Sequence, residues 1–93
     1  MGKVAAPKEV TRDEILKVLR RENPAAKLDK VTIYADAMVE YLAAQANIAQ
    51  HGSIVFHPRT GAPIENPYLK VRNAASKLLV SLGLRSGDLW VGL

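Results

Sequence analysis

The stretch Gly52-Ser-Ile-Val-Phe-His-Pro-Arg-Thr-Gly-Ala-Pro-Ile-Glu-Asn66-Pro67 decides the fold of this chain, because it separates two long segments of helical composition. Gly52 is of the type that ends helices, and Asn66-Pro67 is a favoured helix start. Antiparallel helices are usually joined by about 2 to 8 residues, so this connector is longer than a simple turn. It holds two short apolar runs, Ile54-Val55-Phe56 and Ala62-Pro63-Ile64. The sequence therefore predicts a β-hairpin over residues 53–65 at the turn of a helical hairpin.

The segment before this connector predicts a long helix with apolar residues on two sides. With Asp29 as its N-cap and an end near Gln50, the helix is about 30 Å long. Leu28 and Ile33 have the spacing of a hydrophobic staple around that cap. An ordinary surface helix has a single apolar face, so we expect this one to contact a second copy of the chain. The residues assigned to that contact are Tyr34, Met38, Tyr41, Leu42 and Ile48 of the helix, with Ile54 and Phe56 of the β-hairpin.

A bare β-hairpin is marginal in water unless its apolar residues pack on something. Two interpretations stay open for this one. It packs on a neighbouring copy, or it folds as an intramolecular flap over the end of the helical hairpin.

Two further helices are predicted, one on each side. The first starts at Thr11, because Thr11-Arg-Asp-Glu14 has the spacing of a capping box, and it ends at about Glu22 before Asn23-Pro24. The other follows the connector, with Asn66 as its N-cap and Gly83 as its C-terminal cap. Its predicted buried face repeats at three- and four-residue spacing and consists of Tyr68, Val71, Ala75, Leu78 and Leu82.

Basic residues gather in the N-terminal third of the chain. The net charge is +4, and residues 1–30 hold eight Lys and Arg against five Asp and Glu, whereas residues 31–58 hold no Lys or Arg. A basic segment suits a polyanion such as DNA, although a solvated helix of mixed charge explains the charge alone equally well. The expected phosphate contacts are Lys17, Arg20 and Arg21 on the outer face of the first helix, with Arg12, Lys3 and Lys8 beside them.

Composition argues against most kinds of chemistry. The chain has no cysteine, and His51 and His57 lack carboxylates at ligand spacing, so no metal and no cofactor is predicted. Asp36 and Glu40 lie one turn apart as surface carboxylates, and the serines have neither an elbow motif nor a base partner. We therefore expect no enzyme. Without an apolar run of about 18 residues or a signal-peptide core, the sequence predicts a soluble, cytoplasmic protein with no membrane contact.

The tail after Gly83 ends in apolar residues, and Trp90 has two open interpretations. It packs back on the helical hairpin, or it anchors a partner, since tryptophan is enriched at binding hot spots. Leu89 and Trp90 are assigned to partner contact.

Several of these features together resemble the small subunit of phage terminases. They are a long helix ending in Gly52, a short hairpin, the run Gly61-Ala-Pro-Ile-Glu-Asn66-Pro67 before a helix, and Leu82-Gly-Leu84. The resemblance covers about residues 31–90. It implies a ring-forming, non-catalytic DNA-packaging component. Such a component recognises viral DNA, presents it to the large terminase subunit, and tunes the ATPase and nuclease of that subunit.

The N-terminal part departs from that pattern. Many small terminase subunits carry a helix-turn-helix domain before the oligomerisation hairpin, but here only about 28 residues precede it, too few for a three-helix unit. The chain is more similar to the short small terminases of gene-transfer-agent-like particles, which package DNA with little sequence preference. We therefore expect weakly specific binding of double-stranded DNA through its backbone, with an affinity that falls steeply with salt.

The predicted fold is mostly α: an antiparallel helical hairpin with a small β-hairpin at its turn and a short N-terminal helix, assembled into a ring. Residues 1–28 form a basic arm and short helix, residues 29–83 the oligomerisation domain, and residues 84–93 a C-terminal tail. The expected partners are double-stranded DNA, the large terminase subunit and further copies of the chain. Two other classes remain possible: a small dimeric helical DNA-binding transcriptional regulator, and a scaffold protein that ignores nucleic acid.

Overall fold

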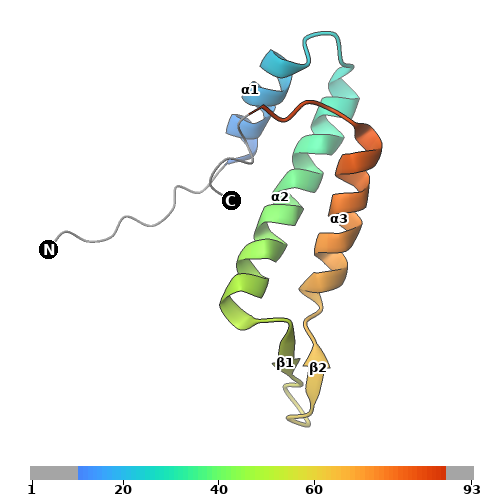
Figure 1. Cartoon of the computed structure of the whole chain (residues 1–93). Coiled ribbons are helices and arrows are strands. Elements are labelled where there is room, and N and C mark those ends of the chain that lie inside the picture. The colour runs from blue at the N-terminus through green and yellow to red at the C-terminus, as the bar shows by residue number, and fades with distance from the viewer. Residues whose placement is uncertain (1–10, 88–93) are drawn as a thin grey trace, which may run out of the picture.

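The computed structural model describes residues 11–87, and in that range it contains three helices and two strands (Figure 1). The helices are α1 (Arg12–Glu22), α2 (Leu28–His51) and α3 (Tyr68–Leu82), and the strands are β1 (Ile54–Phe56) and β2 (Pro63–Glu65). The prediction of a mostly α fold with a small β-hairpin between two helices is confirmed.

α2 is the central element, because both α1 and α3 pack against it. α3 runs antiparallel to α2 along most of its length, whereas the shorter α1 lies beside the N-terminal part of α2 only (Figure 1). The β-hairpin projects beyond the far ends of α2 and α3. The three helices therefore share one end of the molecule, and the β-hairpin forms the other.

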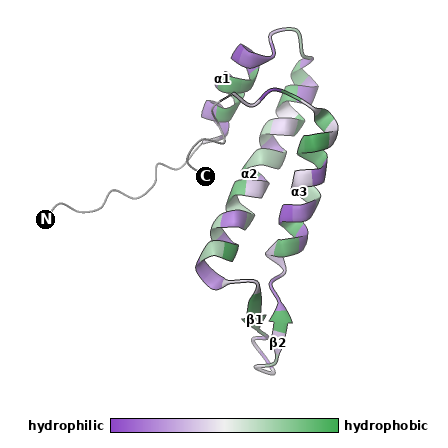
Figure 2. Ribbon diagram, viewed as in Figure 1, coloured by the Kyte–Doolittle hydropathy of each residue, from purple (hydrophilic) through white to green (hydrophobic). Residues whose placement is uncertain are grey.

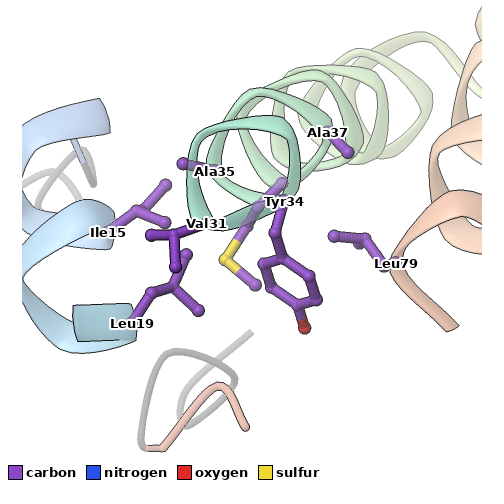
Figure 3. Packing of buried hydrophobic residues seen from close by; sticks show 8 residues of the cluster. Ile15, Leu19, Val31, Tyr34, Ala35, Ala37 and Leu79 are labelled. Carbon is purple, nitrogen blue, oxygen red and sulfur yellow. The ribbon is translucent and has the colours of Figure 1, made fainter. Parts of the chain in front are cut away.

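The core lies where side chains of all three helices meet (Figure 3). Ile15 and Leu19 of α1 have no exposed surface, and Leu79 of α3 is buried on the other side of α2. The remaining buried members of this cluster come from α2 and are Val31, Tyr34, Ala35, Ala37 and Met38. The chain's own helices α1 and α3 thus cover apolar residues on both sides of α2.

This burial corrects two residues of the predicted oligomer contact. Tyr34 is 4% exposed and Met38 is fully buried, so neither offers surface to a second copy. The doubly apolar pattern of α2 has an intramolecular cause, because two helices of the same chain pack against it. We therefore leave Tyr34 and Met38 out of the candidate interface.

Local capping explains where α1 begins and ends. The Thr11 hydroxyl accepts a hydrogen bond from the Glu14 N–H at 3.2 Å, as a residue at the N-cap should. Asn23 follows the last helical residue, and its backbone N–H bonds to the Leu19 carbonyl at 2.8 Å. The predicted start and end of this helix are both confirmed.

The predicted start of α2 needs a correction. α2 begins at Leu28, and the residue before it, Lys27, makes no side-chain cap hydrogen bond. Asp29 lies inside the first turn, where its carboxylate accepts from the Lys30 N–H at 2.9 Å. A negative charge favours a helix start because it complements the helix dipole. Leu28 and Ile33 are both exposed, so they do not form the predicted staple.

The caps of α3 agree with the prediction, and its buried face agrees in part, because Ala75 is buried and Leu82 packs against the core. The Asn66 carboxamide oxygen accepts from the Tyr68 N–H at 3.0 Å, and Gly83 ends the helix at a φ of 64°. Val71 and Leu78 are exposed, however, while Leu79 is buried. Two apolar rows lie side by side on this helix, and packing on α2 selects the row of Leu79.

The β-hairpin has the predicted position and pairs its strands in the register Ile54↔Glu65, Val55↔Ile64 and Phe56↔Pro63. Alternation places Val55 and Ile64 on one half-buried face and the other four residues on an exposed face. The structure does not show the intramolecular flap, since the β-hairpin points away from the helices (Figure 1). In Figure 2 the two strands are mainly hydrophobic, whereas the loop that joins them is not.

Candidate nucleic-acid interface and assembly surfaces

The outer face of α1 carries three cations. Lys17, Arg20 and Arg21 are exposed, and the helical period places them opposite the buried pair Ile15 and Leu19. The Arg21 guanidinium lies 3.6 Å from the carboxylate of Glu22, a surface contact of small energetic weight. We name Lys17, Arg20 and Arg21 the α1 cation face.

Arg12, the other cation expected to contact DNA from this helix, is engaged within the chain. Its Nε donates to the Asp36 carboxylate of α2 at 2.6 Å, and both side chains are about half exposed. This hydrogen bond and the charge of Asp36 raise the pKa of the Arg12 guanidinium. Because Asp36 competes with any phosphate for that guanidinium, Arg12 is a weaker candidate than the α1 cation face. Lys3 and Lys8 lie outside the described residues.

The segment after α3 is tied to the end of α1, a contact that the sequence did not reveal. The Asn23 carboxamide donates to the Arg85 carbonyl at 2.6 Å and accepts from the Arg85 N–H at 2.8 Å. Its amide nitrogen also donates to the Leu19 carbonyl of α1 at 2.9 Å. At Gly87, a Cβ would lie 2.8 Å from a Glu22 carboxylate oxygen, so only glycine fits without a shift. Leu89 and Trp90, the predicted partner contacts, lie outside the described residues.

The surfaces available to a second copy lie on the β-hairpin and on the sides of α2 and α3. Phe56 is 71% exposed and Ile54 is 57% exposed. Of the predicted contacts on α2, Tyr41, Leu42 and Ile48 are half-buried. α3 exposes further apolar residues that the sequence does not assign to a contact. Three of them belong to its predicted buried face, and the fourth belongs to no predicted set: Tyr68, Val71, Leu78 and Val80.

The two long helices differ in charge. α3 contains Lys70, Arg72 and Lys77 and no acidic residue. α2 carries Asp36 and Glu40 on its exposed surface and has no Lys or Arg after its first turn. Asp36 is already paired with Arg12, and Arg72 donates to the Gln45 carboxamide of α2 at 3.2 Å. The charge difference between the two helices therefore rests chiefly on Glu40 of α2 against Lys70 and Lys77 of α3.

Two open hollows lie near the three-helix end. One of about 310 Å³ is lined by Tyr34, Tyr41, Leu79, Val80 and Leu84, among others, and contains no carboxylate or imidazole. The other, of about 240 Å³, lies at the turn between α1 and α2 beside Arg20. Neither hollow brings a nucleophile together with a base.

Within residues 11–87, no group of three or more His, Asp or Glu side chains is placed to hold a metal ion. In the same range, no helix is long and apolar enough to cross a membrane.

Comparison with known proteins agrees with these features. Searches of curated proteins and of solved structures found no match for the chain. A family model described as the small subunit of phage terminase matches residues 10–87. That range includes α1, both strands, both long helices and the segment tied to Asn23. The chain therefore belongs to the family of phage terminase small subunits.

Proposed function

We propose that this chain is a non-catalytic DNA-packaging subunit that assembles with copies of itself, binds double-stranded DNA through α1 and delivers it to the large terminase subunit. Membership of the terminase family supports a role in phage packaging. The observation that carries the DNA-binding part is the α1 cation face. A host bacterial cytoplasm is the compartment that this role requires.

The DNA contact is made mainly to phosphates. Lys17, Arg20 and Arg21 are long cationic side chains on one exposed helix face, and such side chains bind phosphate oxygens without reading the base sequence. Residues 11–27 contain one helix, of 11 residues, so this range holds no separate recognition helix. Weak sequence preference and strong salt dependence follow from this arrangement.

Self-assembly is supported by exposed apolar residues and by the charges of α2 and α3. Glu40 on α2 and the cations Lys70 and Lys77 on α3 carry opposite charges that complement each other between successive copies, as in a head-to-tail contact. Ile54 and Phe56 add apolar area at the β-hairpin end. A head-to-tail contact generates a closed ring when its rotation closes on itself.

The mass in solution and the salt dependence of DNA binding test the proposal together. We expect a mass of many subunits, retardation of unrelated duplexes with similar affinity, and retention of the large subunit on an affinity column carrying this chain. A dimer that prefers one DNA sequence would instead support a transcriptional regulator. An assembly that ignores DNA even at low salt would support a scaffold protein.

A further inference from the structure

Asn66 is the one buried polar residue among those that the structure describes, with 1% of its surface exposed. Its carboxamide nitrogen donates to the Gly52 carbonyl at 2.9 Å and to the Asn47 carboxamide oxygen at 3.0 Å. Its carboxamide oxygen accepts from the Tyr68 N–H at 3.0 Å. Every hydrogen-bonding group of this side chain is therefore used.

The backbone of Asn66 adds two hydrogen bonds at the junction where α2, β1 and α3 meet. Its N–H donates to the Ser53 carbonyl at 2.7 Å, and its carbonyl accepts from the Leu69 N–H at 3.0 Å. One residue thus connects the last turns of α2, the start of β1 and the first turn of α3. Gly52 adopts a φ of 83° there, a conformation that favours glycine.

This junction is where the β-hairpin is anchored to the helices. The two strands pair with each other, and the β-hairpin projects beyond the ends of α2 and α3 (Figure 1). The strands pack chiefly on each other and not on the helices, so the hydrogen bonds of Asn66 lie where they can set the angle at which the β-hairpin leaves the helices.

Asparagine suits this position better than related residues because it is both donor and acceptor. Aspartate keeps the acceptor for the Tyr68 N–H, but its carboxylate faces the Gly52 carbonyl and donates nothing to it. Serine also caps a helix well, but its hydroxyl is shorter and has a single proton to donate. Either substitution preserves the cap of α3, but aspartate loses both hydrogen bonds that the Asn66 side chain donates to Asn47 and Gly52, and serine keeps no more than one of them.

We propose that Asn66 is a positioning residue for assembly: it fixes the direction of the β-hairpin so that Ile54 and Phe56 reach a neighbouring copy of the chain. This role rests on the proposed self-assembly. A strand rises about 3.4 Å per residue, so Phe56 lies about 10 Å from the junction. A rotation of about 20° there moves Phe56 by roughly 3 to 4 Å, whereas a gap of about 1 Å already weakens a van der Waals contact.

The test compares Asn66→Asp and Asn66→Ser with Asn47→Ala. This control removes only the Asn47 carboxamide, one of the two groups that accept a hydrogen bond from the Asn66 side chain. Circular dichroism verifies the helices, and light scattering over a concentration series measures assembly. We expect both Asn66 variants to keep their helical signal and to need about tenfold more protein for half-assembly, with a smaller shift for the control. Wild-type assembly by a helical Asn66 variant would overturn the inference. If Asn66→Asp loses its helical signal, Asn66→Ser decides alone.

A second measurement separates this inference from the proposed function. Residual dipolar couplings of the backbone N–H groups report the direction of β1 relative to α2 in a monomeric sample. If the wild-type chain never assembles, the proposed self-assembly fails, but the couplings still test Asn66. Wild type and Asn66→Asp should then differ in the angle of the β-hairpin, and an identical angle in both would show that Asn66 does not set it.

Discussion

Replacing Lys17, Arg20 and Arg21 together with alanine removes the α1 cation face and leaves the buried side of the helix intact. Each phosphate that a cation neutralises contributes about 0.9 to the slope of log affinity against log salt. Three lost contacts therefore reduce the slope by about 2.7 for each subunit that touches DNA. Between 50 and 200 mM salt, a slope of 2.7 corresponds to a change of about 40-fold in affinity.

Fluorescence anisotropy of a labelled duplex, titrated at several KCl concentrations, measures this slope. The matched control replaces Lys27, Lys30 and Arg59, three exposed cations at the start of α2 and on the β-hairpin, and so lowers the net charge of +4 by the same amount. We expect the α1 variant to flatten the slope, the control to change it much less, and both to keep the wild-type mass. Equal slopes for the α1 variant and wild type would refute the α1 contact. Equal losses in the two variants would show that net charge matters and the position of the cations does not.

Three further predictions concern the fold and the assembly. Leu19→Ala removes a fully buried side chain and should lower the free energy of unfolding, measured in urea, by about 2 to 5 kcal/mol. Val80→Ala, at a position that is 79% exposed, should lower it by less than about 0.5 kcal/mol. Similar losses in the two variants would contradict the packing of α1. The double variant Ile54→Ser, Phe56→Ser should have a lower mass in light scattering. Its melting temperature should change little, because both side chains are exposed. An unchanged mass would show that the β-hairpin is not part of the interface. Gly83→Ala should lower the free energy of unfolding by about 1 kcal/mol, because alanine is strained at a φ of 64° although there is ample space for its methyl group. An unchanged melting temperature would count against this cap.

The ends of the helices could be predicted because capping is local chemistry. The hydroxyl of Thr11 lies three residues before its donor, and the carboxamide of Asn66 lies two residues before its own. Gly52 and Gly83 both have positive φ, as glycines after helices commonly do. These signals are complete within a few residues, and they place the β-hairpin and both long helices.

The packing partners could not be predicted in the same way. The apolar rows of α2 show that two surfaces cover it, but not which ones, so Tyr34 and Met38 were assigned to a second copy although α1 and α3 bury them. On α3 the rows of Leu78 and Leu79 are both apolar, and only tertiary packing distinguishes them.

The same reason limits the prediction of the DNA-binding surface. The α1 cation face follows from the period of a single helix and could be foreseen. The engagement of Arg12 by Asp36 joins residues 24 positions apart, and the Asn23–Arg85 contact joins residues 62 positions apart. Neither pairing leaves a mark in the local sequence.

The contact between Asn23 and Arg85 also bears on how the molecule opens. Arg85 is hydrogen-bonded to Asn23 at the C-terminal end of α1, and α1 packs on α2 through the buried side chains of Ile15 and Leu19. Detachment of α1 therefore breaks the hydrogen bonds that hold Arg85 in the same event, while α2 and α3 keep their contacts with each other. In hydrogen exchange we expect the backbone amides of α1 and of the segment at Arg85 to open together, as one sub-global unit. The free energy of this opening should be lower than that of the α2–α3 pair. A ligand that binds α1 and holds it against α2 would then slow the opening of the Asn23–Arg85 contact. Binding near the N-terminal end of the described chain would thus change the opening rate near its C-terminal end.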